Sequence, residues 1–113
     1  MERGKFVEAF NKASDQLDKK KLKKVTKRSN NAVDTQHNCV VVMEELSELS
    51  QQVSKAARGR IDKSGLIEEM GDVLLQIVSL QDMFGISKLD LYKAMNVKVD
   101  RLELVLNEKG VYL

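Results

Sequence analysis

Two stretches of this 113-residue chain decide its fold: VMEELSEL at residues 42–49 and EEMGDVL at residues 68–74. Both combine the apolar spacing of an amphipathic helix with two carboxylates three residues apart. The pairs are Glu45 with Glu48 and Glu69 with Asp72. Since residues three apart share a helix face, two such helices side by side would bring four acidic groups together. Four negative charges in a partly buried site repel one another strongly, so the arrangement predicts a metal site.

Composition indicates one globular domain over residues 1–113. Apolar residues make up 42% and charged residues 32% of the chain. No apolar run approaches the roughly 20 residues that cross a bilayer, and the first ten residues lack the apolar core of a signal peptide. The single cysteine, Cys39, has no internal disulfide partner, which favours a reducing cytoplasm. The net charge of +2 is too small to indicate nucleic acid binding by itself.

The absence of proline and the scarcity of aromatic residues favour helices. Apolar periodicity predicts four of them, at about residues 5–19, 32–58, 64–84 and 87–110. Like charges crowd a basic segment at about 19–31, where we expect a loop or linker. Because the connections are short, we predict an all-α, four-helix-type bundle with antiparallel neighbours. Its thin first helix leaves hydrophobic surface exposed, so self-association into a dimer or tetramer is expected to complete it.

Three apolar stripes are expected to form the core, one on each of the last three helices, with the paired acids on the flanks of the first two stripes. The stripes comprise Val42, Leu46, Leu49, Val53 and Ala56; Leu66, Ile67, Met70, Val73, Leu74, Ile77 and Val78; and Leu91, Met95, Val99, Leu102 and Leu106. Ser64 and Ser87 are expected to begin their helices as N-caps, and Gly85 to end the third helix.

The type of ligand indicates the cation. Carboxylates without His or Cys partners suit hard ions, so Mg²⁺ is expected before Zn²⁺, with Mn²⁺ as an alternative. The single histidine, His37, argues against a ferritin-like di-iron site, which uses histidine from two helices. For either acidic pair alone, the simpler interpretation is a solvated surface. No Lys or Arg lies between Leu66 and Ser87 to neutralise the second pair, however, which favours a bound cation.

The two acidic motifs resemble a known family signature. Residues 44–48 (EELSE) and 69–72 (EMGD), with twenty residues between them, are similar to the EExxE…ExxD signature of MazG-like all-α nucleoside triphosphate pyrophosphatases. Residues 96–101 are similar to the family's Asn-x-Lys-x-x-Arg stretch. The resemblance covers about residues 36–101. It implies Mg²⁺-dependent hydrolysis of a ribo- or deoxyribonucleoside triphosphate between the α and β phosphates, giving the monophosphate and pyrophosphate.

The resemblance also implies roles for individual residues. The family's metal ligands correspond to Glu45, Glu48, Glu69 and Asp72, and its phosphate contacts to Asn96, Lys98 and Arg101. We expect Glu48 to act as the catalytic base, with Glu45 beside it as the second catalytic carboxylate. Glu44 and Gln76 are expected to contact the metal ligands and to orient them. Gln36 lies in the region that helps to read the base, although it also fits an ordinary polar helix surface.

Two other functions stay open on the sequence alone. One is a non-catalytic helical regulator whose acidic face binds metal or a basic partner, and the other is a metal-dependent enzyme for a different phosphoanhydride. Nucleic acid is a poor partner for the basic run at residues 19–28, which has no interleaved aromatic residues for stacking. The sequence does not indicate the base, the sugar, the number of metal ions or the choice between dimer and tetramer.

Overall fold

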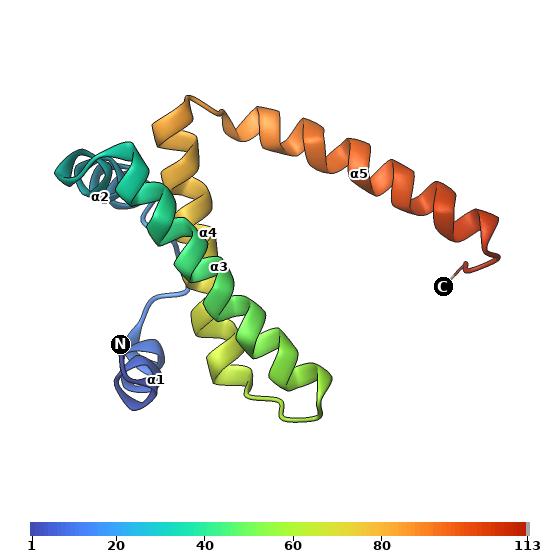
Figure 1. Ribbon diagram of the computed structural model, residues 1–113, viewed down its shortest axis with the longest axis horizontal. Helices are drawn as coiled ribbons and strands as arrows, with labels where there is room; N and C mark the ends of the chain where they lie inside the picture. The colour runs from blue at the N-terminus through green and yellow to red at the C-terminus, as the bar shows by residue number, and fades with distance from the viewer. Residues whose placement is uncertain (113) are drawn as a thin grey trace.

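The computed structural model describes residues 1–112, and within them the chain folds into five α-helices and no strand (Figure 1). The helices are α1 (Arg3–Lys12), α2 (Lys19–Ala32), α3 (Thr35–Ala57), α4 (Lys63–Phe84) and α5 (Lys88–Glu108). The prediction of an all-α fold is therefore confirmed. In this part of the chain no helix is long and apolar enough to cross a membrane.

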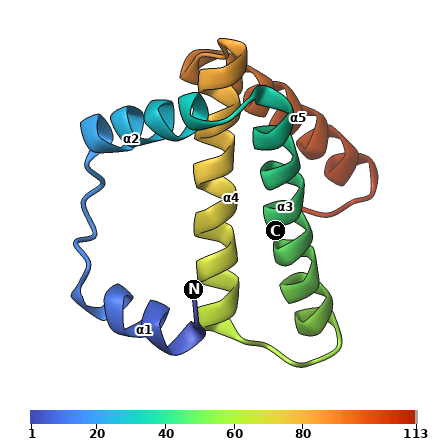
Figure 2. The same ribbon diagram turned by 60° about the vertical axis from the view of Figure 1, so that its left-hand side comes forward.

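The additional helix, α2, forms in the basic segment, so our expectation of a loop there is wrong. Asp18 begins the helix because its side chain accepts a hydrogen bond from the Lys21 amide. Repulsion between like charges costs only about 0.2–0.5 kcal/mol per pair. Against that cost, α2 packs across α4 (Figure 2), and Asn30 donates to the Ser79 carbonyl oxygen and to Asp82. These tertiary contacts decide the conformation.

Side-chain caps explain where the helix boundaries differ from the expected ones. α1 ends at Lys12, well before residue 19, and the Ser14 hydroxyl then accepts a hydrogen bond from the Gln16 amide in a turn that competes with the helix. At the start of α4, Asp62 is the N-cap in place of Ser64 and accepts a hydrogen bond from the Gly65 amide.

The expected helix signals around residues 85–90 are confirmed. Gly85 has φ of 64°, in the left-handed region, and ends α4 with a hydrogen bond from the Ile86 amide to the Gln81 carbonyl oxygen. Ser87 and Asp90 form a reciprocal capping box that begins α5. The direction in which α5 leaves α4 is set at this connection.

α3 and α4 form the antiparallel pair at the centre of the molecule (Figure 2). α1 packs near the start of α4, and α2 crosses α4 near its other end. α5 extends away and packs along none of the other described helices (Figure 1). The prediction of antiparallel neighbours is thus confirmed for α3 with α4. It is wrong for α5. The radius of gyration, 17.0 Å, exceeds the roughly 13 Å of a compact chain of this length.

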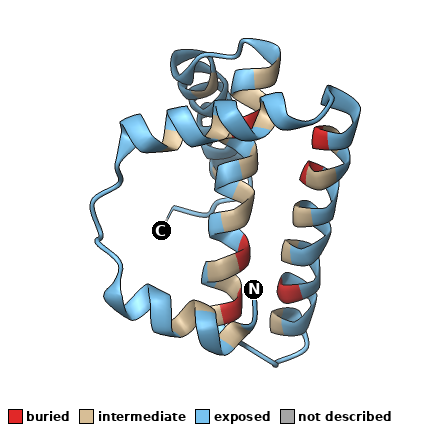
Figure 3. Ribbon diagram, turned by 90° about the vertical axis from the view of Figure 1, so that its left-hand side faces the viewer, coloured by how far each residue is buried: buried red, intermediate tan, exposed pale blue. Residues whose placement is uncertain are grey.

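The expected apolar core of α3 and α4 is only partly formed. Their fully buried positions are mostly polar, whereas several predicted core residues are half-buried, namely Leu49, Ala56, Leu66, Val73 and Val78. The buried positions of these two helices (Figure 3) are Asn38, Val42, Gln52, Gly65, Glu69 and Ser79. Among them, Asn38 and Ser79 bond to Asn30 of α2. Val42 is the one buried hydrophobic side chain among residues 1–112. Much of the predicted core is exposed instead, including Leu46, Val53, Ile67, Met70, Leu74, Ile77, Met95, Val99 and Leu102. The accessible surface is 9507 Å², against about 6300 Å² for a typical folded monomer of 12.8 kDa.

Candidate metal centre

Four carboxylates converge between α3 and α4. Each offers one oxygen atom, and these four atoms all lie within 4.8 Å of one another; the residues are Glu45, Glu48, Glu69 and Asp72. The i, i+3 spacing places each pair on one helix face, and antiparallel packing brings the two faces together. Opposite ligands of Mg²⁺ are about 4 Å apart, twice the Mg–O bond length. The cluster therefore has the dimensions of a site for one small cation.

The electrostatics of the cluster favour a cation. Burial, and then the charges of Asp72, Glu48 and Glu69, raise the pKa of Glu45 from 4.5 to about 7. Burial is also the main cause of the raised pKa of Glu69 and of Asp72, and neighbouring carboxylates add to both. Without a cation, Glu45 therefore keeps its proton to a higher pH than an isolated carboxyl group, and the pKa values of Glu69 and Asp72 shift in the same direction. A divalent cation would offset the repulsion between carboxylates, which contributes to these raised pKa values.

The residues present fit a hard divalent cation. Glu69 is only 8% exposed, and Oε2 of Glu69 and Oε2 of Glu45 are buried without a hydrogen-bond partner. A buried acceptor left unpaired costs about 1–3 kcal/mol, so these two oxygens are poorly explained as a solvated surface. Because the cluster contains neither His nor Cys, its ligands suit Mg²⁺ or Mn²⁺ better than Zn²⁺.

A positively charged side chain from α1, that of Arg3, also lies beside this cluster. The Arg3 guanidinium pairs with Glu68, lies 3.7 Å (Nε) from Oδ2 of Asp62, and lies 3.8 Å (Nη2) from Oε1 of Glu69. Arg3 escapes sequence-based prediction because it is far from the acids in sequence and belongs to no motif with them. Only the docking of α1 near the start of α4 brings it there.

The other predicted site residues lie outside the cluster. Asn96, Lys98 and Arg101 are exposed on α5, so a single chain does not bring these expected phosphate contacts to the acids (Figure 1). Glu44 and Gln36 are exposed on α3. The expected supporting residue Gln76 is half-buried one turn beyond Asp72, where it lines a neighbouring groove.

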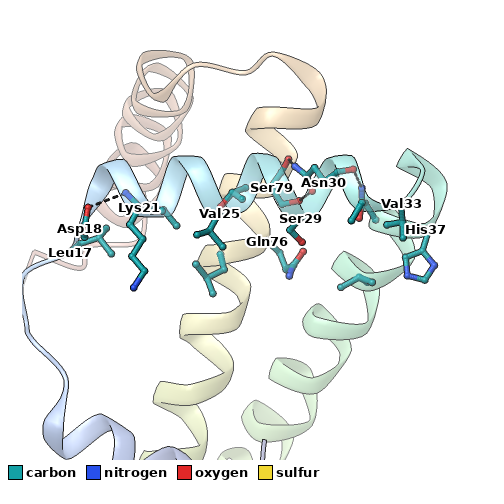
Figure 4. A pocket seen from close by; sticks show the side chains of 16 residues that line it. Leu17, Asp18, Lys21, Val25, Ser29, Asn30, Val33, His37, Gln76 and Ser79 are labelled. Atoms are coloured by element: carbon teal, nitrogen blue, oxygen red, sulfur yellow. Dashed lines mark hydrogen bonds between the residues drawn. The ribbon is translucent and has the colours of Figure 1, made fainter.

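That groove, of about 600 Å³, lies between α2, α3 and α4 (Figure 4). Its walls are mostly apolar, and its polar end is built around Asn30. The Ser79 hydroxyl donates to Oδ1 of Asn30 at 2.6 Å, and Nδ2 of Asn38 donates to the Asn30 carbonyl oxygen at 3.0 Å. The residues named in Figure 4 are Leu17, Asp18, Lys21, Val25, Ser29, Asn30, Val33, His37, Gln76 and Ser79. Gln36 is not among the lining residues, whereas its neighbours His37 and Asn38 are.

Together the fold and the cluster define an all-helical protein with four carboxylates close enough together to share one cation. A family model, the MazG nucleotide pyrophosphohydrolase domain, matches residues 34–101. This match covers more than half of the chain, which therefore belongs to the MazG family, and the resemblance of its motifs is confirmed. The matched region contains all four acids. Searches of curated proteins and of solved structures gave no significant match.

Proposed function

We propose that this protein is a Mg²⁺-dependent nucleotide pyrophosphohydrolase that converts a ribo- or deoxyribonucleoside triphosphate into the monophosphate and pyrophosphate. The observation that carries the proposal is the four-carboxylate cluster inside the family-matched region. Family membership supports the reaction, and the unpartnered oxygens of Glu45 and Glu69 support the cation. The single free cysteine is consistent with activity in the cytoplasm.

The four acids differ in solvent exposure, and this difference suggests a separate role for each. When bound, Mg²⁺ or Mn²⁺ would offset charge on the phosphate oxygens and acidify water. Glu45, Glu69 and Asp72, which are all at least partly buried, would hold the cation. Glu48 is the exposed member and can meet a solvent molecule, so we assign it the role of base. As the water oxygen bonds to the α-phosphorus and the bond to the leaving pyrophosphate breaks, Glu48 takes the proton.

The groove between α2, α3 and α4 is our candidate for the nucleoside. Gln76 lines it one turn beyond Asp72, so a triphosphate at the acids would extend its base in this direction. The apolar walls suit a flat base, and His37 and Asn38 supply polar atoms near it. This placement moves the expected base contact from Gln36 to the two residues that follow it.

Self-association as a dimer or tetramer would complete the site. The chain exposes about 3200 Å² more than a compact monomer of its mass, whereas a standard interface buries only about 800 Å² per partner. Much of the exposed apolar surface is on the outer side of α4 and along α5. Because α5 does not reach the acids of its own chain, we propose that a second copy's α5 supplies the phosphate contacts. The residues of α5 that would make these phosphate contacts are Asn96, Lys98 and Arg101.

Hydrolysis of a panel of ribo- and deoxyribonucleoside triphosphates, with Mg²⁺, tests the function. The assay must separate monophosphate plus pyrophosphate from diphosphate plus phosphate. We expect the first pair of products from the wild type, their loss in Glu48→Gln, and their retention in Glu108→Gln, a control acid exposed outside the matched region. Phosphate release would reject the cleavage position. A folded protein that binds Mn²⁺ but turns over no nucleotide would favour a regulatory role.

A further inference from the structure

The two carboxylate oxygens of Glu69 lie in different surroundings. Oε1 faces the Arg3 guanidinium, with Nη2 at 3.8 Å. Oε2 is buried and has no hydrogen-bond partner. A carboxylate with one oxygen in an ion pair and the other without a partner is in an asymmetric environment that favours one orientation. The bare oxygen belongs to a residue of the four-acid cluster, so its orientation matters for any cation held there.

Arg3 is itself fixed in place by two carboxylates outside the cluster. Its Nη1 pairs with Oε1 of Glu68, and its Nε lies 3.7 Å from Oδ2 of Asp62. Asp62 is already held as the N-cap of α4, through the hydrogen bond at 2.9 Å that it accepts from the Gly65 amide. Three different nitrogen atoms of one guanidinium thus meet three different carboxylates. The planar guanidinium suits this arrangement because its three nitrogen atoms point in fixed and different directions, whereas a lysine ammonium carries its donors on one nitrogen atom.

We propose that Arg3 is a positioning residue of the metal centre: it binds Oε1 of Glu69 and so directs Oε2 toward the cation. The inference rests on the proposed metal centre, and it adds a residue that lies outside the matched region 34–101. It also gives α1 a role, because docking of α1 near the start of α4 brings Arg3 to the acids. Under this proposal Arg3 would stay in place when the cation binds, because the two would use different oxygens of Glu69.

The opposite arrangement is that Arg3 occupies the site as a substitute cation and competes with the metal. The two arrangements predict opposite signs for one measurement, the affinity for Mn²⁺ when Arg3 is replaced. If Arg3 positions Glu69, Arg3→Gln weakens Mn²⁺ binding by about tenfold, as is typical when a group that orients a ligand is lost. If Arg3 competes, the same variant binds Mn²⁺ more tightly.

The experiment is titration of the full chain with Mn²⁺ at pH 8, following free Mn²⁺ by electron paramagnetic resonance without nucleotide. We expect Arg3→Gln to weaken binding, Arg3→Lys to recover part of the loss, and Lys5→Gln to match the wild type. Lys5 is the matched control because it is an exposed cation on the same helix. Unchanged or tighter binding by Arg3→Gln would overturn the proposal. A wild type that binds no Mn²⁺ would instead refute the metal centre itself.

A second variant separates positioning from a general loss of structure. Glu68→Gln keeps Arg3 but removes its closest anchor. If Arg3 acts through this anchor, Glu68→Gln weakens Mn²⁺ binding, and the double variant binds no worse than Arg3→Gln alone. Fully additive losses would show that the two residues act independently and would reject the proposed linkage. Circular dichroism of each variant without metal checks that the helices are intact.

Discussion

Replacing Glu45 with Gln is expected to stabilise the metal-free protein at pH 8 and to destabilise it, relative to the wild type, when Mn²⁺ is present. Gln keeps nearly the shape of Glu but cannot ionise. At pH 8 the wild-type Glu45 is charged, partly desolvated and beside three other acids. Removing that charge relieves repulsion in the absence of a cation. In the presence of one, it removes a ligand.

The size of the effect follows from the pKa of Glu45, which rises from 4.5 to about 7 on folding. A shift of this size corresponds to at most about 3 kcal/mol, and solvent around the carboxylate reduces it to about 1–2 kcal/mol. Because the folded-state pKa is the higher one, the folded state binds the proton more tightly. The contribution of Glu45 to stability is therefore most favourable below pH 4.5 and is lost as the pH rises to about 7. The advantage of Glu45→Gln should be small at pH 5 and complete at pH 8.

Urea denaturation of both proteins at pH 5, 6, 7 and 8 in EDTA measures this difference. Repeating the series with Mn²⁺ at about 100 times its dissociation constant should add about 2.7 kcal/mol to the wild type and much less to the variant. The order of stabilities at pH 8 then reverses between EDTA and Mn²⁺. A variant that is less stable than the wild type in EDTA at pH 8 would refute the reasoning, because Glu45 would then be a structural hydrogen-bonding residue.

Three further predictions concern the fold and its surface. Asn30→Ala should lower the unfolding free energy by about 1–3 kcal/mol in urea denaturation, since it leaves Ser79 without its partner at 2.6 Å. Gly85→Ala should cost about 1 kcal/mol in the same assay, through the left-handed backbone alone, because no atom lies within 4 Å of the added Cβ. Leu74→Glu, at a side chain that is 65% exposed in one chain, should shift sedimentation toward the monomer. Unchanged sedimentation would show that this face of α4 is not an interface.

The helices could be predicted from sequence because their signals are local. Gly85 and the Ser87–Asp90 capping box each act within one turn of a helix. As expected, Gly85 ends α4 and the capping box begins α5. The conformation of residues 19–31 could not be predicted in this way. The local signal there is repulsion between lysines, and the deciding contacts are the hydrogen bonds from Asn30 to residues of α4. Long-range contacts of this kind leave no periodic pattern in the sequence.

The acidic cluster could be predicted because two i, i+3 pairs on neighbouring helices need only antiparallel packing to meet. Which side of each helix would be buried was less predictable. Leu46 and Val53 were expected inside, but Glu45 and Gln52 face α4 instead. Helical periodicity identifies an apolar side without telling whether the same chain or another one covers it. The role of Arg3 could not be predicted either, since a single arginine has no spacing that relates it to the acids.

The placement of acids inside and apolar residues outside suggests that metal binding and self-association are coupled. Val42 is the one fully buried hydrophobic side chain of α3 and α4, and others such as Leu49 and Val73 are half-buried, so only limited apolar energy offsets the repulsion within the cluster. A cation would fix the spacing of these helices, and that spacing sets the shape of the outer apolar side of α4. Mn²⁺ should therefore strengthen self-association, and by reciprocity self-association should tighten Mn²⁺ binding. Sedimentation across a range of protein concentrations, in EDTA and in Mn²⁺, tests this, and equal association constants would show that the two sites act independently.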